Sequence, residues 1–324
     1  MTIPPKDLLS SSGLVIVDKP AGMTSHDVVG KLRRAFSTRR VGHAGTLDPM
    51  ATGVLIVGLE RGTKFLAHMV ASTKSYSATI RLGQATTTDD KEGTRISCAD
   101  ANVLAQLDDA AIHDALTHFR GQIMQRPAKV SAIKINGKRA HERVRAGEDV
   151  VIPARPVEIM RFEILEIRRG TDTAVPVEYS DEIPPAPADE VGFIDIDVEV
   201  DCSSGTYIRS LARDLGEHLN VGGHLTQLRR TAVGPFTLDD ALPLDALEEN
   251  PVLSLSLDES LIRCYPTLEI TEAEAADLAK GQWLQPRKLT GVHAAVAPNG
   301  QAIALVKEQG KRLASVFVAR PSTL

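Results

Sequence analysis

Apolar residues follow two patterns along the chain, and each pattern predicts a different kind of element. Residues 13–20 (GLVIVDKP) and 53–58 (GVLIVG) are short β-branched runs bounded by glycine or proline, which is typical of strands buried on both faces. Residues 74–82 and 193–200 alternate apolar and polar positions, so they predict strands with one buried face. We therefore expect a sheet that has both central and half-exposed strands.

Helical periodicity separates these strands. Residues 25–36 place four apolar side chains on one face after a candidate N-cap at Ser25. Residues 203–219 begin with Ser-Ser-Gly and carry an apolar stripe at helical spacing. A third helix-like segment ends near Phe119. Strands and helices that alternate irregularly in this way favour an α+β arrangement.

The last part of the chain changes in character. An acidic stretch at 238–259 contains Asn250-Pro251 and is predicted to be a linker. It is followed by a helix at 272–280 and by short strands at regular spacing, which predict a small barrel or sandwich. The predicted organisation is a flexible tail, an α+β (mixed α/β) domain and a small β-rich domain, at 1–12, 13–250 and 258–324 respectively.

Two segments are too polar to be core elements. Residues 120–156 are rich in cations and contain the hairpin-type dipeptide Asn136-Gly137, so they predict a protruding basic hairpin and helix that could clamp RNA backbone. Residues 170–192 are acidic and proline-rich and cannot bury much apolar surface. We interpret the second segment as a surface insertion.

The net charge of −5 conceals a segregated charge distribution. Residues 31–40 hold five cations and no acid, and residues 120–145 hold eight cations against one acid. Residues 171–201 hold ten acids and no cation. Any one run could be an ordinary solvated face, but two basic runs on either side of a candidate site favour a partner that carries phosphates.

Composition excludes several classes of protein. No apolar run approaches the ~20 residues that span a bilayer, and the N-terminus lacks the pattern of a signal peptide, so we expect a cytoplasmic protein. Cys98, Cys202 and Cys264 form no C-x-x-C pattern, which argues against a disulfide framework and a zinc site. We expect no metal and no cofactor.

Asp48 is the candidate for chemistry. It is the only acid between Val41 and Leu59, and glycines on both sides permit a tight loop that ends at the predicted strand 53–58. One interpretation is an Asx-type turn ahead of Pro49. The other is a catalytic carboxylate presented by a shaped loop on a rigid element.

The whole string decides between these interpretations. Residues 42–55, GHAGTLDPMATGVL, closely resemble the catalytic motif of the bacterial tRNA pseudouridine synthase B family, whose Asp in G-T-L-D-P is essential. Further family motifs follow in order: K-P-x-G-x-T-S at 19–25, K-x-Y at 74–76, S-G-T-Y-I-R-S-L-A-x-D-L-G at 204–216, and the stretch 224–236. The resemblance covers 13–167 and 193–236 closely. It implies a pseudouridine synthase fold and, as substrate, the T-loop uridine of tRNA at position 55.

The resemblance also implies roles for individual residues. Asp48 would be the catalytic carboxylate and Arg209 its ion-pair partner, although Arg209 could instead form a surface pair with Asp214. Tyr76 would stack on the flipped base and assist proton transfer from C5 as a further catalytic residue, although an isolated strand tyrosine is as often packing. The remaining base-contacting residues implied by the family are His43, Tyr207 and Leu228.

The resemblance assigns the basic segment at 120–156 to the family's RNA-gripping thumb, from which this chain departs at Ala128 and His141. Residues 258–324 resemble a PUA-type RNA-binding module, through L-x-x-G-Q-x-L at 278–284. Lys19 also has an architectural interpretation, as a strand-to-loop corner. The predicted RNA-contacting residues are Lys19, Lys64, Arg126, Lys134, Lys138, Arg139, Arg143, Arg229 and Arg230.

Three alternatives stay open. The chain could bind or fold tRNA without chemistry, although its Asp48 and Arg209 argue for catalysis. It could act with a guide RNA in a ribonucleoprotein, which the thumb and the lack of long basic tails disfavour. It could be an unrelated aspartate hydrolase, for which no second carboxylate is placed. We expect a monomer whose partner is the tRNA T-stem-loop, with no protein partner and no membrane.

Overall fold

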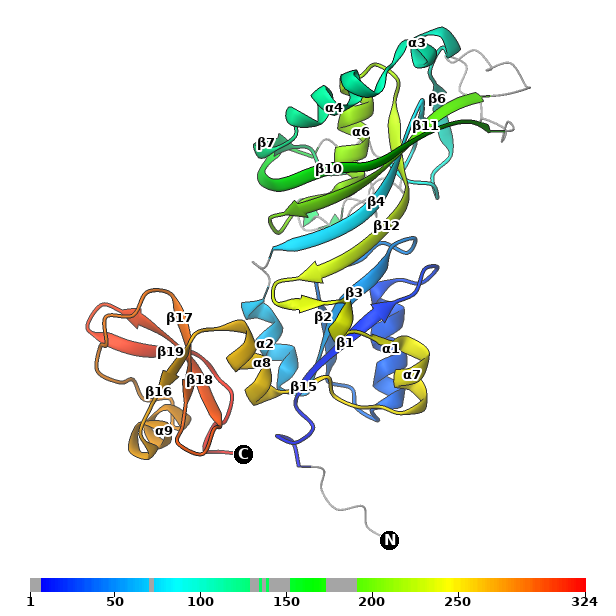
Figure 1. The fold of residues 1–324 in the computed structure, drawn as a ribbon. Coiled ribbons are helices and arrows are strands. Elements are labelled where there is room, and N and C mark those ends of the chain that lie inside the picture. The colour runs from blue at the N-terminus through cyan, green and yellow to red at the C-terminus, as the bar shows by residue number, and fades with distance from the viewer. Residues whose placement is uncertain (1–6, 70–72, 129–133, 136–137, 140–151, 173–190) are drawn as a thin grey trace. The chain divides into compact units, whose positions relative to one another are not determined.

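The computed structural model describes residues 7–69, 73–128, 134–135, 138–139, 152–172 and 191–324. The chain divides into two compact units, residues 1–72 with 232–324 and residues 73–231 (Figure 1). These units cut the chain differently from the predicted domains 13–250 and 258–324, and those domain boundaries stay a prediction. Most of the predicted tail and insertions at 1–12, 120–156 and 170–192 lies outside the described residues.

The first unit is built on β1. Residues Leu14 to Val17 of β1 are all fully buried, as the continuous apolar run predicts. β1 pairs antiparallel with β3 from Gly13↔Leu59 to Lys19↔Gly53, and β3 pairs with β2. The N-terminal elements of this unit are β1 (Gly13–Lys19), α1 (Ser25–Ala35), β2 (Val41–Ala44), β3 (Thr52–Leu59), α2 (Gly62–Phe65) and η1 (Leu66–His68).

The prediction that residues 238–259 form a linker is wrong. β14 pairs parallel with β1 at Val17↔Leu242, and β15 pairs antiparallel with it at Gly13↔Ser256. The segment therefore supplies backbone partners for the outer edge of β1, which a charged sequence does not reveal. It contains η2 (Leu238–Asp240), β14 (Leu242–Pro243), α7 (Leu244–Glu249) and β15 (Leu255–Ser256), and it follows the short strand β13 (Phe236–Thr237).

The C-terminal part of the first unit is the predicted β-rich body. Its sheet has the order β16-β17-β18-β19, with β16 parallel to β17 and the other pairs antiparallel. Leu278 of α9 is fully buried in the core beneath this sheet. The elements are α8 (Leu257–Cys264), β16 (Thr267–Glu269), α9 (Glu272–Ala279), β17 (Val292–Val296), β18 (Ala302–Gln309) and β19 (Arg312–Val318).

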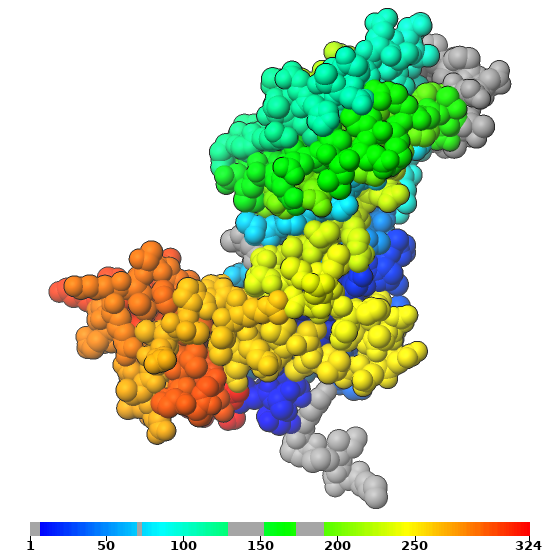
Figure 2. Space-filling view, viewed as in Figure 1, coloured from blue at the N-terminus to red at the C-terminus, as the bar shows by residue number. Residues whose placement is uncertain are grey.

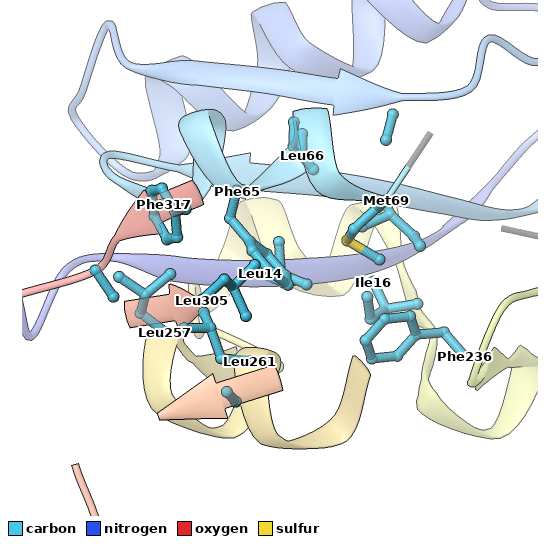
Figure 3. Packing of buried hydrophobic residues seen from close by; sticks show 14 of the residues in the cluster. Leu14, Ile16, Phe65, Leu66, Met69, Phe236, Leu257, Leu261, Leu305 and Phe317 are labelled. Carbon is cyan, nitrogen blue, oxygen red and sulfur yellow. The ribbon is translucent and has the colours of Figure 1, made fainter. Parts of the chain in front are cut away.

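One apolar core joins this body to the N-terminal strands of the same unit. Phe65 of α2 lies 6.1 Å from the Phe317 ring and 6.4 Å from the Tyr265 ring, in a cluster that also contains Leu14 and Leu305 (Figure 3). Arg61 donates to the carbonyls of Val318 and Ala319. In the space-filling view, the 238–264 segment (yellow to amber) continues into the orange and red body without a break (Figure 2). The C-terminal body is therefore packed onto this unit by shared core.

The second unit is an antiparallel sheet with helices on one face. The order is β12-β4-β11-β10-β7, and Tyr76 on β4 stands opposite Val200 on β11. Burial alternates along β11, as its sequence predicts. The elements are β4 (Lys74–Leu82), β5 (Gln84–Thr86), β6 (Arg95–Cys98), α3 (Ala101–Gln106), α4 (Asp109–Thr117), β7 (Gly121–Gln125), β8 (Lys134–Ile135), β9 (Lys138–Arg139), β10 (Arg155–Asp172), β11 (Val191–Cys202), α6 (Ile208–His218) and β12 (Gly223–Val233).

The other face of this sheet carries cross-strand ion pairs. Arg81 donates to both carboxylate oxygens of Asp195 at 2.8 Å, and Arg161 reaches Asp201 at 2.8 Å. Thr79 donates to Asp197 at 2.6 Å. Because these are the outward positions of β4, β10 and β11, the apolar residues between them are free to form the core.

In the part of the chain that the structure describes, no helix is long and apolar enough to cross a membrane. The same residues contain no group of three or more His, Cys, Asp or Glu side chains that could hold a metal ion. Cys98, Cys202 and Cys264 are free thiols, and burial raises the pKa of the Cys202 thiol to about 11.

Candidate active site

The loop that carries Asp48 lies between two paired strands, β2 and β3. Gly45 has φ of +74° and Gly53 has φ of +102°, so the chain enters and leaves the loop through left-handed backbone that glycine adopts without strain. The Ala51 N–H donates to the Asp48 carbonyl at 3.1 Å, which closes a turn with Pro49 in its second position. The Asp48 side chain is half-buried.

Both neighbours of Asp48 are tied to the 19–25 segment. Ser25 Oγ donates to the Leu47 carbonyl at 3.1 Å and accepts from the Leu47 N–H at 2.9 Å. On the other side, the Gly22 N–H donates to the Pro49 carbonyl at 2.9 Å. The backbone on each side of Asp48 is therefore held by side-chain and main-chain bonds to one short segment, which fixes the position of the Asp48 backbone.

Ser25 does not cap α1 as predicted. The N-cap is Thr24, whose side chain accepts from the Asp27 N–H at 3.1 Å while the Asp27 carboxylate accepts from the Thr24 N–H at 2.8 Å. This reciprocal box satisfies the helix start and leaves the Ser25 hydroxyl for Leu47. The carboxylate of Asp27 has a lowered pKa because Thr24 donates to it.

Lys19 is not available to RNA, so that predicted contact is wrong. Its side chain is fully buried, and Nζ donates to the carbonyls of Pro20 at 2.8 Å, Met23 at 2.7 Å and Pro49 at 3.3 Å. Three carbonyl acceptors compensate the ammonium for its lost hydration. Lys19 thus supports the Asp48 loop from beneath, which agrees with its architectural interpretation.

We expect Lys19→Met to destabilise the protein by roughly 3 kcal/mol, since it leaves buried carbonyls without a donor while roughly keeping the side-chain volume. Chemical denaturation measures this loss. RNA affinity and its salt dependence should stay at the wild-type values under folding conditions. A reduced salt slope with normal stability would instead restore Lys19 as an RNA contact.

His43 lies on β2 opposite Val57 and is half-buried. It shares the first unit with Asp48, five residues before it. The structure thus places two of the predicted site residues on one strand and the loop that follows it. Their contact with a base stays a prediction.

The second unit carries the other predicted site residues on three elements. Tyr76 stands on β4, Leu228 on β12, and Tyr207 and Arg209 at the start of α6. Tyr76 and Leu228 are each 7% exposed, and Tyr207 is half-buried. Because Asp48 and Arg209 belong to different compact units, their predicted ion pair stays a prediction.

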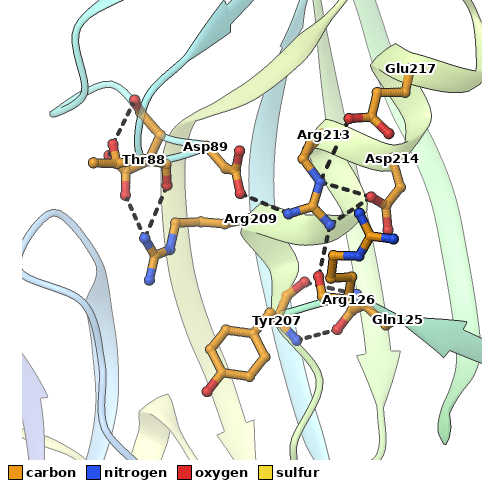
Figure 4. A network of polar contacts seen from close by, with 10 residues as sticks. Thr88, Asp89, Gln125, Arg126, Tyr207, Arg209, Arg213, Asp214 and Glu217 are labelled. Atoms are coloured by element: carbon orange, nitrogen blue, oxygen red, sulfur yellow. Dashed lines mark hydrogen bonds and ion pairs between the residues drawn. The ribbon is translucent and has the colours of Figure 1, made fainter. Parts of the chain in front are cut away.

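Arg209 has a partner that the sequence analysis missed. Its Nη1 donates to the Thr88 carbonyl at 3.0 Å and lies 3.3 Å from Asp90 Oδ2, and the side chains of Arg209 and Asp90 are 6% and 4% exposed (Figure 4). The other Asp90 oxygen accepts from Thr88 Oγ1 at 2.6 Å and from the Glu92 N–H at 3.0 Å. The loop at 87–92 therefore fixes one side of the guanidinium.

The alternative pairing of Arg209 with Asp214 is wrong. Asp214 accepts from Arg213 instead, at 2.7 Å. A sequence signal for the 87–92 loop did exist: Thr88-Asp89-Asp90 ahead of Gly93 is a run of turn residues whose side chains bond nearby backbone. It could have indicated a structured loop in place of a merely polar one, but not its contact with Arg209.

Apart from Lys19, the predicted RNA-contacting residues divide into three groups. Lys64 and Arg126 are exposed and Arg229 is half-buried, which leaves all three compatible with the prediction. Arg230 is 1% exposed, so its predicted RNA contact is wrong and the alternative bracing role remains. The third group is Lys134, Lys138, Arg139 and Arg143: the first three stand on the paired strands β8 and β9 with side chains that are not described, and Arg143 lies outside the described residues.

The basic run at 31–40 is largely exposed. Arg33, Arg34, Arg39 and Arg40 are exposed, and Lys31 is half-buried. Some of these cations have local partners: Lys31 pairs with Glu248 at 2.6 Å, Arg33 donates to the Val41 carbonyl at 3.2 Å, and Arg40 lies 3.5 Å from Glu60. Because ion pairs at the surface are weak, the run remains able to attract phosphates.

Comparisons with protein families cover most of the chain. The model described as TruB family pseudouridylate synthase (N terminal domain) matches residues 33–208. The model described as tRNA pseudouridylate synthase B C-terminal domain matches 209–265, and that described as tRNA Pseudouridine synthase II, C terminal, matches 265–320.

Curated relatives match along their whole lengths. The chain is 69% identical to a tRNA pseudouridine synthase B of Corynebacterium diphtheriae over 318 residues, which are 98% of this chain and 99% of the relative. It is 66% identical to that of Corynebacterium efficiens, with the same shares of both chains. A relative from Mycobacterium sp. (strain KMS), also named tRNA pseudouridine synthase B, is 53% identical over 96% of this chain and 97% of its own.

Solved structures share the fold at lower identity. A chain in the structure of an H/ACA RNP bound to a substrate RNA containing 2'-deoxyuridine matches with a TM-score of 0.66 and 22% identity, over 98% of this chain and 88% of that one. A chain of a Cbf5-Nop10-Gar1 complex matches with a TM-score of 0.67 and 23% identity, over the same shares. The mixed α/β arrangement followed by a C-terminal β-rich body is thus the pseudouridine synthase fold, as predicted.

Proposed function

We propose that this chain, which belongs to the TruB family of pseudouridylate synthases, isomerises uridine to pseudouridine in tRNA, at the T-loop position numbered 55. The observation that carries the proposal is identity of 53–69% to relatives named tRNA pseudouridine synthase B along nearly the whole chain. The string at 42–55 adds to it, because its aspartate stands on a braced loop.

The chemistry needs few groups. The bond from N1 of uracil to C1′ of ribose breaks, the base turns, and C5 bonds to C1′; C5 loses a proton and N1 gains one, so the reaction is redox-neutral. A carboxylate can serve it as covalent nucleophile or as the base that starts an elimination. We assign this role to Asp48, whose flanking residues Leu47 and Pro49 are both tied to the 19–25 segment.

Arg209 is assigned to the same step. A guanidinium beside a carboxylate keeps it ionised and oriented through charge-assisted hydrogen bonds. Arg209 is buried and held by Asp90 and the Thr88 carbonyl, so little side-chain entropy would be lost on engaging a further partner. In this proposal Asp90 orients the Arg209 guanidinium, and the Asp48 carboxylate accepts a hydrogen bond from it.

Base recognition is assigned to the aromatic and apolar residues of the second unit. The reacting atoms of uridine are inaccessible in a folded T-loop, so the nucleotide must leave its stack. Tyr76 would then stack on the base, Tyr207 and Leu228 would line its surroundings, and His43 would contact the RNA. Lys64, Arg126 and Arg229 would meet the phosphates, and the 120–156 thumb would grip the backbone.

The proposed substrate is free tRNA in the cytoplasm, bound by a monomer with no protein partner and no cofactor. The relatives at 53–69% identity are named for tRNA, whereas the similarity to H/ACA RNP proteins at 22–23% identity concerns the fold. We therefore favour direct recognition of tRNA over a guide RNA. A tRNA-binding or tRNA-folding protein without catalysis is the alternative.

The test is release of tritium from T-stem-loop RNA that carries [5-³H]uridine only at position 55. Isomerisation must release the label, because C5 becomes the glycosidic carbon. We expect complete release by the purified chain alone, and none from an RNA labelled only at another uridine. Tight binding without release would leave the non-catalytic alternative; release from the other uridine would refute the assignment of position 55.

A further inference from the structure

The start of α6 is bonded to the end of β7 by a single amide side chain. Gln125 Nε2 donates to the Tyr207 carbonyl at 3.0 Å, and the Tyr207 N–H donates to Gln125 Oε1 at 2.8 Å (Figure 4). Gln125 is 1% exposed. Its side chain therefore supplies the pair of bonds that a facing strand residue would supply, and satisfies both backbone groups of Tyr207.

The Gln125 bonds add to the ordinary helical bond at Tyr207, whose carbonyl also accepts from the Leu211 N–H at 3.2 Å. Tyr207 is the N-cap residue of α6 and makes no side-chain capping bond. Gly205, two residues earlier, has φ of +86°, so the chain turns sharply just before the helix. That turn is anchored at its other end, where Ser203 exchanges bonds with Glu158 of β10: its N–H donates at 2.9 Å and its Oγ accepts at 3.0 Å. Gln125 holds the end that leads into the helix.

Arg213 makes a second connection one helical turn further on. Its Nη1 donates to Asp89 at 3.0 Å, its Nη2 to the Arg126 carbonyl at 2.7 Å, and its Nε to Asp214 at 2.9 Å. Burial raises the pKa of both Asp89 and Asp214, and the Arg213 charge opposes that shift for each. One guanidinium thus bonds α6 to the 87–92 loop and to the residue after Gln125.

The two connections converge on residues assigned to the reaction. Gln125 bonds the backbone of Tyr207, two residues before Arg209. Arg213 bonds Asp89, the neighbour of Thr88 and Asp90, which are the partners of Arg209. Neither Gln125 nor Arg213 needs to touch RNA to act, because each sets the position of a group that is proposed to do so.

We propose that Gln125 and Arg213 are positioning residues for pseudouridylation, Gln125 for the Tyr207 ring and Arg213 for the Arg209 guanidinium. This inference rests on the proposed function. Its physical basis is that a displacement of about 1 Å at a positioning contact can cost on the order of a hundredfold in rate without loss of binding. A purely structural role would change stability and leave the rate at saturating RNA unchanged.

The test compares Gln125→Met and Arg213→Lys with two matched controls. Gln125→Met removes both amide bonds at similar length, and Arg213→Lys keeps the charge but not the fork. Thr79→Val removes the bond from the Thr79 hydroxyl to Asp197, and Arg81→Lys keeps the charge but not the fork that bonds Asp195. Single-turnover tritium release at saturating T-stem-loop RNA gives the rate, filter binding gives Kd, and thermal unfolding gives Tm.

We expect both site variants to lose roughly tenfold to a hundredfold in rate, with Kd within about threefold of wild type. The controls should keep the wild-type rate even where Tm falls. A wild-type rate in folded Gln125→Met and Arg213→Lys would overturn the inference. If Gln125→Met does not fold, Gln125→Asn decides in its place, because it keeps a neutral amide but shortens the side chain by one methylene and so withdraws it from both Tyr207 groups. A wild-type protein that releases no tritium would refute the proposed function itself, which is a distinguishable outcome.

Discussion

Replacing Asp48 with asparagine is expected to abolish tritium release, with a fall in single-turnover rate of roughly four orders of magnitude or more. The amide matches the carboxylate in shape but cannot act as nucleophile or base at neutral pH. The loop should keep its conformation, because its supports are Lys19, Ser25 and the backbone around Pro49, none of which depends on a charge at Asp48. RNA affinity should therefore be retained.

The matched control is Asp245→Asn, which makes the same change at an exposed carboxylate in the first turn of α7. It should leave rate and affinity at the wild-type values. Retention of more than about one tenth of the wild-type rate by Asp48→Asn would contradict the assignment of the carboxylate, since catalytic groups are worth far more than that. Loss of rate together with loss of binding and Tm would point to a misfolded loop.

Arg209→Lys is expected to lower the rate at saturating RNA by roughly 10²- to 10³-fold while Kd changes little. Lysine keeps the charge, but its ammonium cannot reproduce the planar guanidinium that bonds the Thr88 carbonyl and reaches Asp90. Arg168→Lys is the control, because it makes the same change at an arginine that donates to Asp197 through two nitrogens on the ion-paired face of the sheet.

The role of Asp90 follows from a double-mutant cycle. Asp90→Asn should lower the rate by a smaller factor, about tenfold, because Asp90 acts through Arg209. In the Arg209→Lys background, adding Asp90→Asn should lower the rate little further, since both changes disrupt the same contact. Fully multiplicative losses in Arg209→Lys/Asp90→Asn would show that the two residues act independently, contrary to the buried contact between them.

Much of the fold could be predicted because local composition determines it. The strands at 13–19 and 52–59 have uncharged centres rich in β-branched residues, and short runs of this kind bounded by glycine or proline favour burial in a sheet. The alternation in 191–202 similarly determines which side of β11 faces the core. The predicted helix-like segment ending at Phe119 is divided into α3 and α4, because Asp108 caps a new helix start.

The candidate site was predictable to the extent that its motifs are contiguous. Asp48, Tyr76, Tyr207 and Arg209 were found because each stands in an uninterrupted string of family residues. Asp90, Gln125 and Arg213 were not, because their partners lie far away along the chain. Gln125 and Arg213 also bond backbone atoms, which carry no residue signature. The contact from Arg213 to the Arg126 carbonyl spans 87 residues, and that from Gln125 to Tyr207 spans 82.

The sequence by itself determined the strands, the order of the motifs and the carboxylate that they present. Only the tertiary structure decided which cations and acids are internal. Lys19 and Arg230 are cations of the kind that contact RNA, but both are buried. Residues 238–259 have the composition of a linker, but two short strands in them pair with β1. The physical reason is that a long charged side chain can be either hydrated or compensated by buried carbonyls, and a strand edge can pair with any backbone. For Lys19 these carbonyls include that of Pro49, 30 residues away. Whether such a side chain is buried, and which backbone pairs with the edge, therefore depends on partners that only the folded chain brings together.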